Sequence, residues 1–419
     1  MNSLVKVLPN VKKFNEYMFN VNKKVNPIML SGLTDVGKVH LAYATKFYSD
    51  RPMCIITYNE LQAKKIMKDL EYFKEKIEFF PKREIVSYDY IAESKDLLYQ
   101  RISCMNNIIN KKAKIIVTTI EAVNQRMISK DILYKNLLKL KVGDTIQLDE
   151  LKEKLVLLGY ERYDLIEGKG QFSVRGGIID IAFEENIGTR IELWGDEIDS
   201  IRLFNISTQR STEMVNEIEV YPAFEMVLET NLEDVCEKIA ENNKVKSLKE
   251  KIEEDIEQIK SGEYLNKIDR YFDSFYSKTS TLLDYLDEDY LIFLDEIGKI
   301  KARQENILKD NENIVKDLVE RNKIVPNILE NMNNFEKFSE KLDKKQVIYL
   351  EKQDLGFVDK KSMHAKRNGY SFSYREVNFF RSSMDLLFKE VQEARKQGKR
   401  TVILSRKRGK CEEDVRFTI

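Results

Sequence analysis

Residues 27–39 read PIMLSGLTDVGKV, in which a short apolar run leads into a glycine-rich turn. The segment Gly32–Val39 matches the phosphate-loop pattern GxxxxGK(S/T) at every position except the last. The residues that follow, VHLAYATKFY, have helical spacing, so the pattern lies between a strand and a helix, as in a working phosphate loop. This stretch predicts an α/β domain built around the turn.

The turn lacks two properties of a working phosphate loop. Val39 has no hydroxyl to hold Mg²⁺, and Asp35 adds a negative charge where an anion would bind. Gly37 and Lys38 are retained, so three interpretations are open: nucleotide hydrolysis, weak nucleotide binding, and a structural relic of an ATPase. We favour the relic, and we expect no catalytic residue and no metal site in the chain.

Further strands and helices alternate through residues 1–135. MCIITY at 53–58 and KIIVTT at 114–119 are short apolar runs typical of buried strands. Asn59 with Gln62 is a plausible capping box for a helix over 61–73, and 120–128 is a further helix candidate. Strands that alternate with helices favour a parallel sheet with right-handed crossovers.

Residues 136–222 have a different sequence pattern from the residues before them. Short strand-like runs are separated by Gly, Asn and Asp turns, and one helix-like segment, DELKEKLVLLGY, lies among them. The segment holds ten Lys and Arg against seventeen Asp and Glu, a net charge of about −7, which argues against binding to a phosphate backbone. We interpret it as a separate α+β module.

Residues 223–345 are largely helical and highly charged, with one strand candidate at Tyr290–Leu294. Asp295 and Glu296 follow it and resemble an acidic pair that holds a metal and positions water, although a strand end that caps the next helix is an equally good interpretation. Because an ancestral site needs Lys38 and this pair around one phosphate, we predict that the strands before Gly32 and Asp295 share a sheet, with 136–222 as an insertion. Residues 346–419 are predicted to be a linker and the start of a truncated α/β domain, with a helix at 377–394 and a strand at 400–405.

Composition excludes several classes of protein. The chain has 70 basic and 70 acidic residues, no apolar run that approaches the ~18 residues of a membrane span, and no secretory signal at its start. Four dispersed cysteines and two histidines argue against a disulfide framework, a His-rich metal site and a Ser-His-Asp hydrolase. We therefore expect a cytoplasmic protein without membrane contact.

The run GYERYDLIEGKGQFSVRGGIIDIAFEENIGTRIELWGDEIDSIRLFNISTQRS at 159–211 is the most specific signal. It resembles the module by which UvrB and the bacterial transcription-repair coupling factors bind UvrA in nucleotide excision repair. The resemblance covers roughly residues 20–400 and implies a RecA-like divided domain. Val39, and the short stretch at 87–109 where UvrB has a long hairpin, favour the N-terminal UvrB-homology region of the coupling factors over UvrB.

The resemblance implies a function and a set of site residues. It implies that the module at 136–222 recruits UvrA, and that Arg175, Arg190 and Trp194 make contacts with it. Strand alternation in TRIELWGDE places Glu192 on the same face as Arg190 and Trp194. The bland alternative is a buried Trp194, with the arginines paired to the acids of the module. The degenerate nucleotide loop comprises Gly32, Gly37, Lys38, Asp295 and Glu296.

The family also has parts that are not located in this chain. These are an RNA-polymerase-binding domain and a DNA-translocating motor that uses ATP and Mg²⁺, so no cofactor is expected here. Two alternatives to an UvrA-recruiting adaptor stay open: a UvrB-like ATPase active in this fragment, and a generic DNA-binding module. Basic segments such as Lys399–Arg400 and Arg406–Lys410 suggest the DNA-binding alternative.

Overall fold

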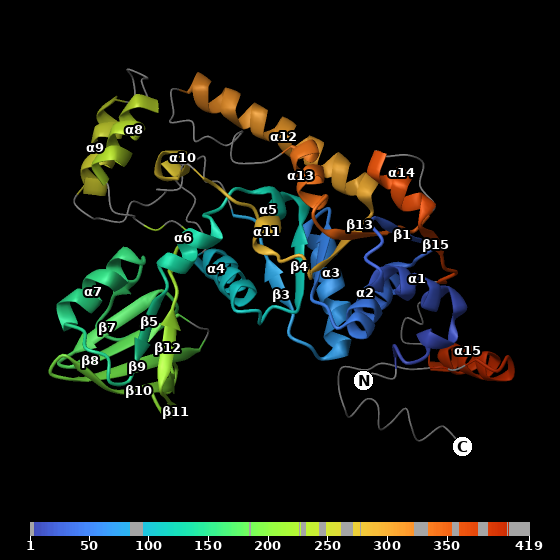
Figure 1. Ribbon diagram of the computed structural model, residues 1–419, viewed down its shortest axis with the longest axis horizontal. Coiled ribbons are helices and arrows are strands. Elements are labelled where there is room, and N and C mark those ends of the chain that lie inside the picture. Colours follow the sequence, from blue (N-terminus) through green and yellow to red (C-terminus); the bar gives the residue numbers. More distant parts are fainter. Residues whose placement is uncertain are drawn as a thin grey trace.

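The computed structural model describes residues 4–83, 95–183, 186–225, 227, 232–242, 249–260, 271–276, 278–321, 334–353, 360–375, 384–399 and 401. Within these ranges the chain forms a helix-covered parallel sheet and, beside it, a smaller module built on its own sheet (Figure 1). The predicted α/β class with an inserted α+β module is confirmed.

The larger sheet has seven strands in the order β15-β1-β14-β13-β2-β4-β3, and all neighbours are parallel. The strands are β1 (Ile28–Ser31), β2 (Met53–Thr57), β3 (Glu78–Phe80), β4 (Ile115–Thr119), β13 (Leu291–Asp295), β14 (Gln346–Leu350) and β15 (Gly369–Ser371). Since β1 and β13 both pair with β14, the strands before Gly32 and Asp295 share a sheet, as predicted.

The structure differs from the predicted boundary at residue 345. β14 lies between β1 and β13, and β15 is an edge strand of the same sheet, so the divided domain continues to at least residue 371. The reason is that QVIYL is buried at all five positions and completes the sheet centre, although polar residues surround it in the sequence. Parallel strands covered on both faces are short apolar runs of this kind.

Alternate residues of the central strands point into two apolar layers. Ile55 and Phe293 face the layer that contains α1 (Lys12–Asn22), α2 (Asp35–Ser49) and α3 (Glu60–Leu70). Cys54 and Ile292 face the other layer. The helices of that layer include α4 (Lys95–Ile109), α5 (Ile120–Asn124), α6 (Lys130–Lys135), α11 (Leu282–Tyr285), α12 (Ile297–Glu320), α13 (Phe335–Leu342) and α14 (Lys360–Arg367).

Side-chain caps define where several helices begin. Thr34 accepts a 3.1 Å hydrogen bond from the Gly37 amide at the start of α2, and Asn59 accepts a 2.8 Å bond from the Gln62 amide at the start of α3. The helix start predicted at Asn59 is thus confirmed, and a short turn, η2 (Glu71–Phe73), extends α3. A further short turn, η1 (Leu8–Asn10), precedes α1.

The inserted module has a two-stranded sheet, a six-stranded sheet and one helix. Its elements are β5 (Leu138–Lys141), α7 (Leu148–Leu157), β6 (Glu161–Arg162), β7 (Gln171–Arg175), β8 (Ile178–Ala182), β9 (Ile187–Trp194), β10 (Glu197–Asn205), β11 (Ser211–Val215) and β12 (Glu217–Val220). The six-stranded sheet has the order β11-β10-β9-β8-β7-β6. The first and last strands, β5 and β12, pair antiparallel, so the insert leaves and rejoins the divided domain at one place.

One face of the six-stranded sheet is apolar. Ile179, Ile191 and Ile201 pack with Leu151 and Leu155 of α7 into a core that is separate from the layers of the large sheet. The opposite face, which we call the outer face, carries polar side chains together with a small buried apolar cluster around Phe204. Its residues are described with the site below.

A buried ion pair fastens the insert to the divided domain. Arg101 of α4 donates to both carboxylate oxygens of Glu225, just beyond β12, and to the Pro81 carbonyl at 2.7 Å. Its guanidinium lies 4.2 Å from the Phe80 ring centroid. Burial alone would raise the pKa of Glu225, but the charge of Arg101 outweighs it and holds that pKa below its ordinary value. The junction is therefore a fixed, charged contact.

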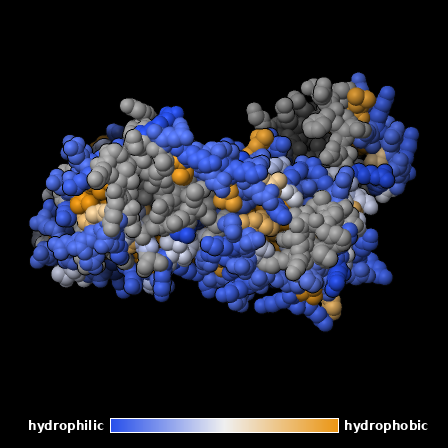
Figure 2. Space-filling view, turned by 90° about the horizontal axis from the view of Figure 1, so that it is seen from above, coloured by the Kyte–Doolittle hydropathy of each residue, from blue (hydrophilic) through white to orange (hydrophobic). Residues whose placement is uncertain are grey.

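The remaining described helices are α8 (Leu232–Asn242), α9 (Lys249–Lys260), α10 (Phe272–Phe275) and α15 (Met384–Lys396). α15 coincides with most of the helix predicted at 377–394, whereas the strand predicted at 400–405 lies outside the described residues apart from Thr401. The surface seen from above is mostly hydrophilic with small, separate apolar patches (Figure 2). In the described residues, no helix combines the length and apolar composition needed to cross a bilayer.

Candidate functional site

The glycine-rich turn connects β1 to α2 and has the backbone shape its sequence requires. Gly32 has φ of +71°, a conformation that favours glycine, and an added Cβ would lie 1.9 Å from the Phe372 carbonyl oxygen. The turn therefore forms as the phosphate-loop pattern predicts, with the first turn of α2 behind it.

Lys38 meets the predicted acidic pair. Its Nζ donates to Asp295 Oδ1 at 2.7 Å and to Glu296, and only 3% of the lysine is exposed. Thr57 donates to the second oxygen of Asp295 at 2.8 Å. Burial lowers the pKa of Lys38, but the two carboxylates outweigh burial and raise it above its ordinary value, so the ammonium stays charged. The structure thus brings Lys38, Asp295 and Glu296 together.

The chain itself covers the turn. The Tyr374 ring lies 2.7 Å from the position that a Cβ of Gly37 would occupy. The backbone amide of Tyr374 donates a 3.1 Å hydrogen bond to the Gly32 carbonyl. The Tyr374 hydroxyl lies 3.0 Å from His40 Nδ1. The cavity beside Lys38 has a volume of about 10 Å³, enough for a single water, whereas ligand pockets measure roughly 300 Å³ or more. This cavity is therefore too small for a nucleotide.

A third carboxylate, Glu351, lies beside this cluster at the end of β14. It is fully buried, and Oε1 accepts a 3.0 Å hydrogen bond from the Ile297 amide, while Oε2 has no partner among the described residues. Burial raises the pKa of Glu351 to about 8; the Ile297 amide opposes the rise and the charge of Glu296 adds to it. Glu351 is therefore mostly protonated at neutral pH. No spacing in the sequence distinguishes Glu351 from any other Glu that follows a strand.

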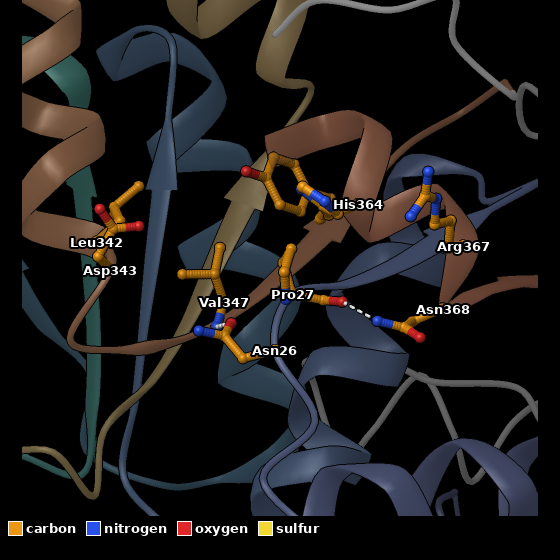
Figure 3. Close-up of a pocket in the computed structure, with 9 residues that line it drawn as sticks. Asn26, Pro27, Leu342, Asp343, Val347, His364, Arg367 and Asn368 are labelled. Carbon is orange, nitrogen blue, oxygen red and sulfur yellow. Dashed lines mark hydrogen bonds between the residues drawn. The ribbon is translucent and has the colours of Figure 1, made fainter. Parts of the chain in front are cut away.

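A larger cavity of about 330 Å³ lies at the opposite ends of β1 and β14 (Figure 3). His364 and Arg367 of α14 line one side, and Leu342 and Asp343 line another. The two asparagines that line it hold the backbone: Asn368 donates to the Pro27 carbonyl at 3.0 Å, and Asn26 accepts from the Val347 amide at 2.8 Å. These bonds hold the start of β1 against β14 and the end of α14.

The outer face of the insert carries a continuous cross-strand row over five strands. In register, Ser173 lies opposite Asp180, Asp180 opposite Arg190, Arg190 opposite Arg202, and Arg202 opposite Met214. Side chains of one such row share a face of the sheet. The face therefore collects three of the ten basic residues of the module, because Arg175 lies two residues from Ser173.

Asp180 is the centre of the row. It is fully buried and accepts two bonds from Arg190, at 2.7 and 2.9 Å, and one from Arg175 at 2.7 Å. The bond to Asp180 raises the pKa of Arg190 above its ordinary value, although burial opposes it. The Arg190 guanidinium also lies 4.8 Å from the Phe204 ring centroid. Both arginines are held in fixed orientations.

The next residues along β9 are Glu192 and Trp194. Glu192 accepts hydrogen bonds from Ser200, at 3.0 Å, and from Arg202. Trp194 is 84% exposed and precedes the two-residue turn to β10. The prediction that Trp194 is exposed is confirmed. The alternative prediction for the arginines, that they pair with acids of the module, is also met, because Arg175 and Arg190 both bond to Asp180. Asp180 and Arg202 lie within the 159–211 run, and strand register is the signal that finds them.

These features define a class: a parallel α/β domain with a closed phosphate loop, divided by a module that has one charged and aromatic face. Residues 138–226 match the family described as the UvrB interaction domain. The chain is 28% identical over 407 residues to the transcription-repair-coupling factor of Bacillus subtilis, and the alignment covers 93% of this chain and 34% of that protein. It is also 28% identical over 305 residues to the Staphylococcus aureus protein of the same name, covering 70% of this chain and 26% of that protein.

The chain is therefore related to the N-terminal, UvrB-like region of the transcription-repair coupling factors. It spans about a third or less of the length of the curated relatives it matches.

Proposed function

We propose that the chain is an adaptor that recruits UvrA to stalled transcription through the outer face of its insert. The observation that carries this proposal is the highly exposed Trp194 beside arginines fixed by a buried carboxylate. A large exposed aromatic rimmed by oriented charges has the composition of an interface hot spot. The match to the UvrB interaction domain and the name of the relatives support UvrA as the partner and transcription-coupled repair as the process.

The phosphate loop has no catalytic role in this proposal. Lys38 is neutralised by Asp295 and Glu296, and Tyr374 packs against the turn, which argues against a UvrB-like ATPase in this chain. ATP, Mg²⁺, RNA polymerase and DNA are assigned to the remaining part of the longer relatives. The acidic charge of the insert argues against DNA as its partner. Such an adaptor works in the bacterial cytoplasm.

The test is the binding of the full chain to immobilised UvrA, measured by biolayer interferometry. We expect the parent to bind and Trp194→Ala to weaken binding at least about tenfold. Phe19→Ala is the matched control, because Phe19 is an exposed aromatic of α1, outside the insert. Absence of binding by the parent contradicts the proposal, as does equal binding by the parent and Trp194→Ala.

A further inference from the structure

Two side chains of like charge face each other at the β9–β10 pair of the outer face. Arg190 and Arg202 lie directly opposite each other, where like charges destabilise a sheet. Asp180 already accepts three hydrogen bonds from Arg190 and Arg175, so it is not available to neutralise Arg202. The only carboxylate that Arg202 reaches within the described residues is Glu192, through Nη2.

Arg202 is also incompletely bonded. Its Nε is buried and has no hydrogen-bond partner among the described residues. A single carboxylate oxygen of Glu192 accepts hydrogen bonds from both Arg202 and Ser200. A guanidinium binds a carboxylate best through two parallel N–H donors, and Arg190 does so with Asp180. Arg202 therefore has donor capacity that its own chain leaves unused.

An exposed apolar side chain stands next to this guanidinium. Met214 on β11 is directly opposite Arg202 and is 70% exposed. Among the large hydrophobic residues of the described chain, Trp194 and Met214 have the two highest exposed fractions. Both lie on the outer face, one on each side of Arg202 and Glu192. Unbranched methionine adapts its shape to an incoming apolar surface.

We propose that Arg202 and Met214 form a second anchor of the partner-binding face, which takes a protein segment with a carboxylate next to an apolar side chain. This inference rests on the proposed function and names the chemistry of the partner at that same face. The side chain of Arg202 is 36% exposed, so the partner carboxylate pairs with the Nη groups at the end of its guanidinium and relieves the repulsion from Arg190, while the apolar group covers Met214.

Charge complementarity gives this anchor its selectivity. The insert as a whole has a net charge of about −7, whereas the row Asp180–Arg190–Arg202 places two guanidinium groups side by side at the centre of the outer face. A carboxylate of the partner is attracted to this pair of arginines, which orient the partner as well as bind it.

The test uses the full chain and UvrA in the same interferometry assay. Arg202→Lys keeps the positive charge but removes the planar fork of Nη donors, and Met214→Ala removes the apolar group. We expect each to weaken binding about fivefold, the double variant to show a non-additive effect, and Met214→Leu to bind like the parent. Ser211→Ala on the same strand is the control, and thermal melts establish that each variant is folded.

The outcomes separate this inference from the proposed function. If Trp194→Ala loses binding while Arg202→Lys and Met214→Ala bind like the parent, the second anchor is wrong and the UvrA-binding face stands. If the parent does not bind UvrA, the proposed function is wrong and the second anchor falls with it. Should Arg202→Lys melt early, Met214→Ala alone decides, because an exposed methionine on an edge strand is removable without loss of the fold.

Discussion

Nζ of Lys38, in the first turn of α2, donates a 2.7 Å hydrogen bond to Oδ1 of Asp295, at the end of β13, although 257 residues separate them. The whole insert lies between the two in sequence. The bond is buried and belongs to a cluster that includes Thr57 and Glu296. The contact joins the two halves of the divided domain.

Loss of Lys38 is expected to destabilise the fold. Lys38→Met keeps the length of the side chain but leaves Asp295 and Glu296 without their shared cation, and breaking a buried ion pair costs about 3–5 kcal/mol. Urea denaturation of the variant and the parent measures the difference. Lys12→Met is the control, since the Lys12 side chain is 92% exposed and should change stability by less than about 0.5 kcal/mol. Equal denaturation midpoints for Lys38→Met and the parent would show that the pair contributes nothing.

Restoring the missing hydroxyl is not expected to restore ATP hydrolysis. Val39→Thr supplies the Mg²⁺ ligand that the loop pattern demands, but Lys38 remains bonded to Asp295 and Tyr374 still packs on Gly37. Phosphate release by the parent and by Val39→Thr should both stay at the background rate, with and without DNA. Turnover by Val39→Thr that disappears in a Lys38→Ala background would show that the loop opens.

Glu351 is expected to make the stability depend on pH. Its pKa is about 8 in the folded chain against an ordinary value of 4.5, so between these values the folded state binds more protons than the unfolded state. The free energy of unfolding therefore falls as pH rises through this window and levels off above pH 8. Below pH 4.5 both states are protonated and the penalty is absent.

Glu351→Gln tests this dependence, because the amide imitates the protonated carboxyl group. The variant should match the parent near pH 5 and exceed it by on the order of a few kcal/mol near pH 8. Urea denaturation at pH 5, 6.5 and 8 provides the comparison, and the difference between the two proteins matters because other groups titrate equally in both. A constant difference across the series argues against a raised pKa.

The sequence predicts the pieces of the large sheet better than their order. The apolar runs before Gly32 and Asp295 and the loop pattern between strand and helix were sufficient to place both strands in one sheet. The sequence does not predict β14, because five apolar residues within a polar segment carry no periodicity that separates a central strand from a linker. Its position depends on pairing with β1 and β13, which are distant in sequence.

The outer face shows the same division between local and long-range information. Strand alternation puts Trp194 and Ile191 on opposite faces of β9, and the structure exposes Trp194 and buries Ile191. The contact of Arg190 with Asp180 depends on the register of β8 against β9, which alternation within one strand does not determine. Residues that act through a cross-strand neighbour are therefore found only in the structure.

This register changes the prediction for the arginines. Arg190→Ala leaves the buried carboxylate of Asp180 with Arg175 as its remaining charged partner, so it should lower the thermal midpoint of the chain as well as weaken UvrA binding about tenfold. Trp194→Ala should weaken binding to the same degree at an unchanged midpoint, because the indole is exposed. Arg175, with a side chain 49% exposed and one bond to Asp180, should lie between the two. Binding and differential scanning fluorimetry of all three variants give the comparison.

If Arg190→Ala melts like the parent, Asp180 does not depend on that guanidinium. If Trp194→Ala melts early, the tryptophan is part of the module core rather than of its binding face.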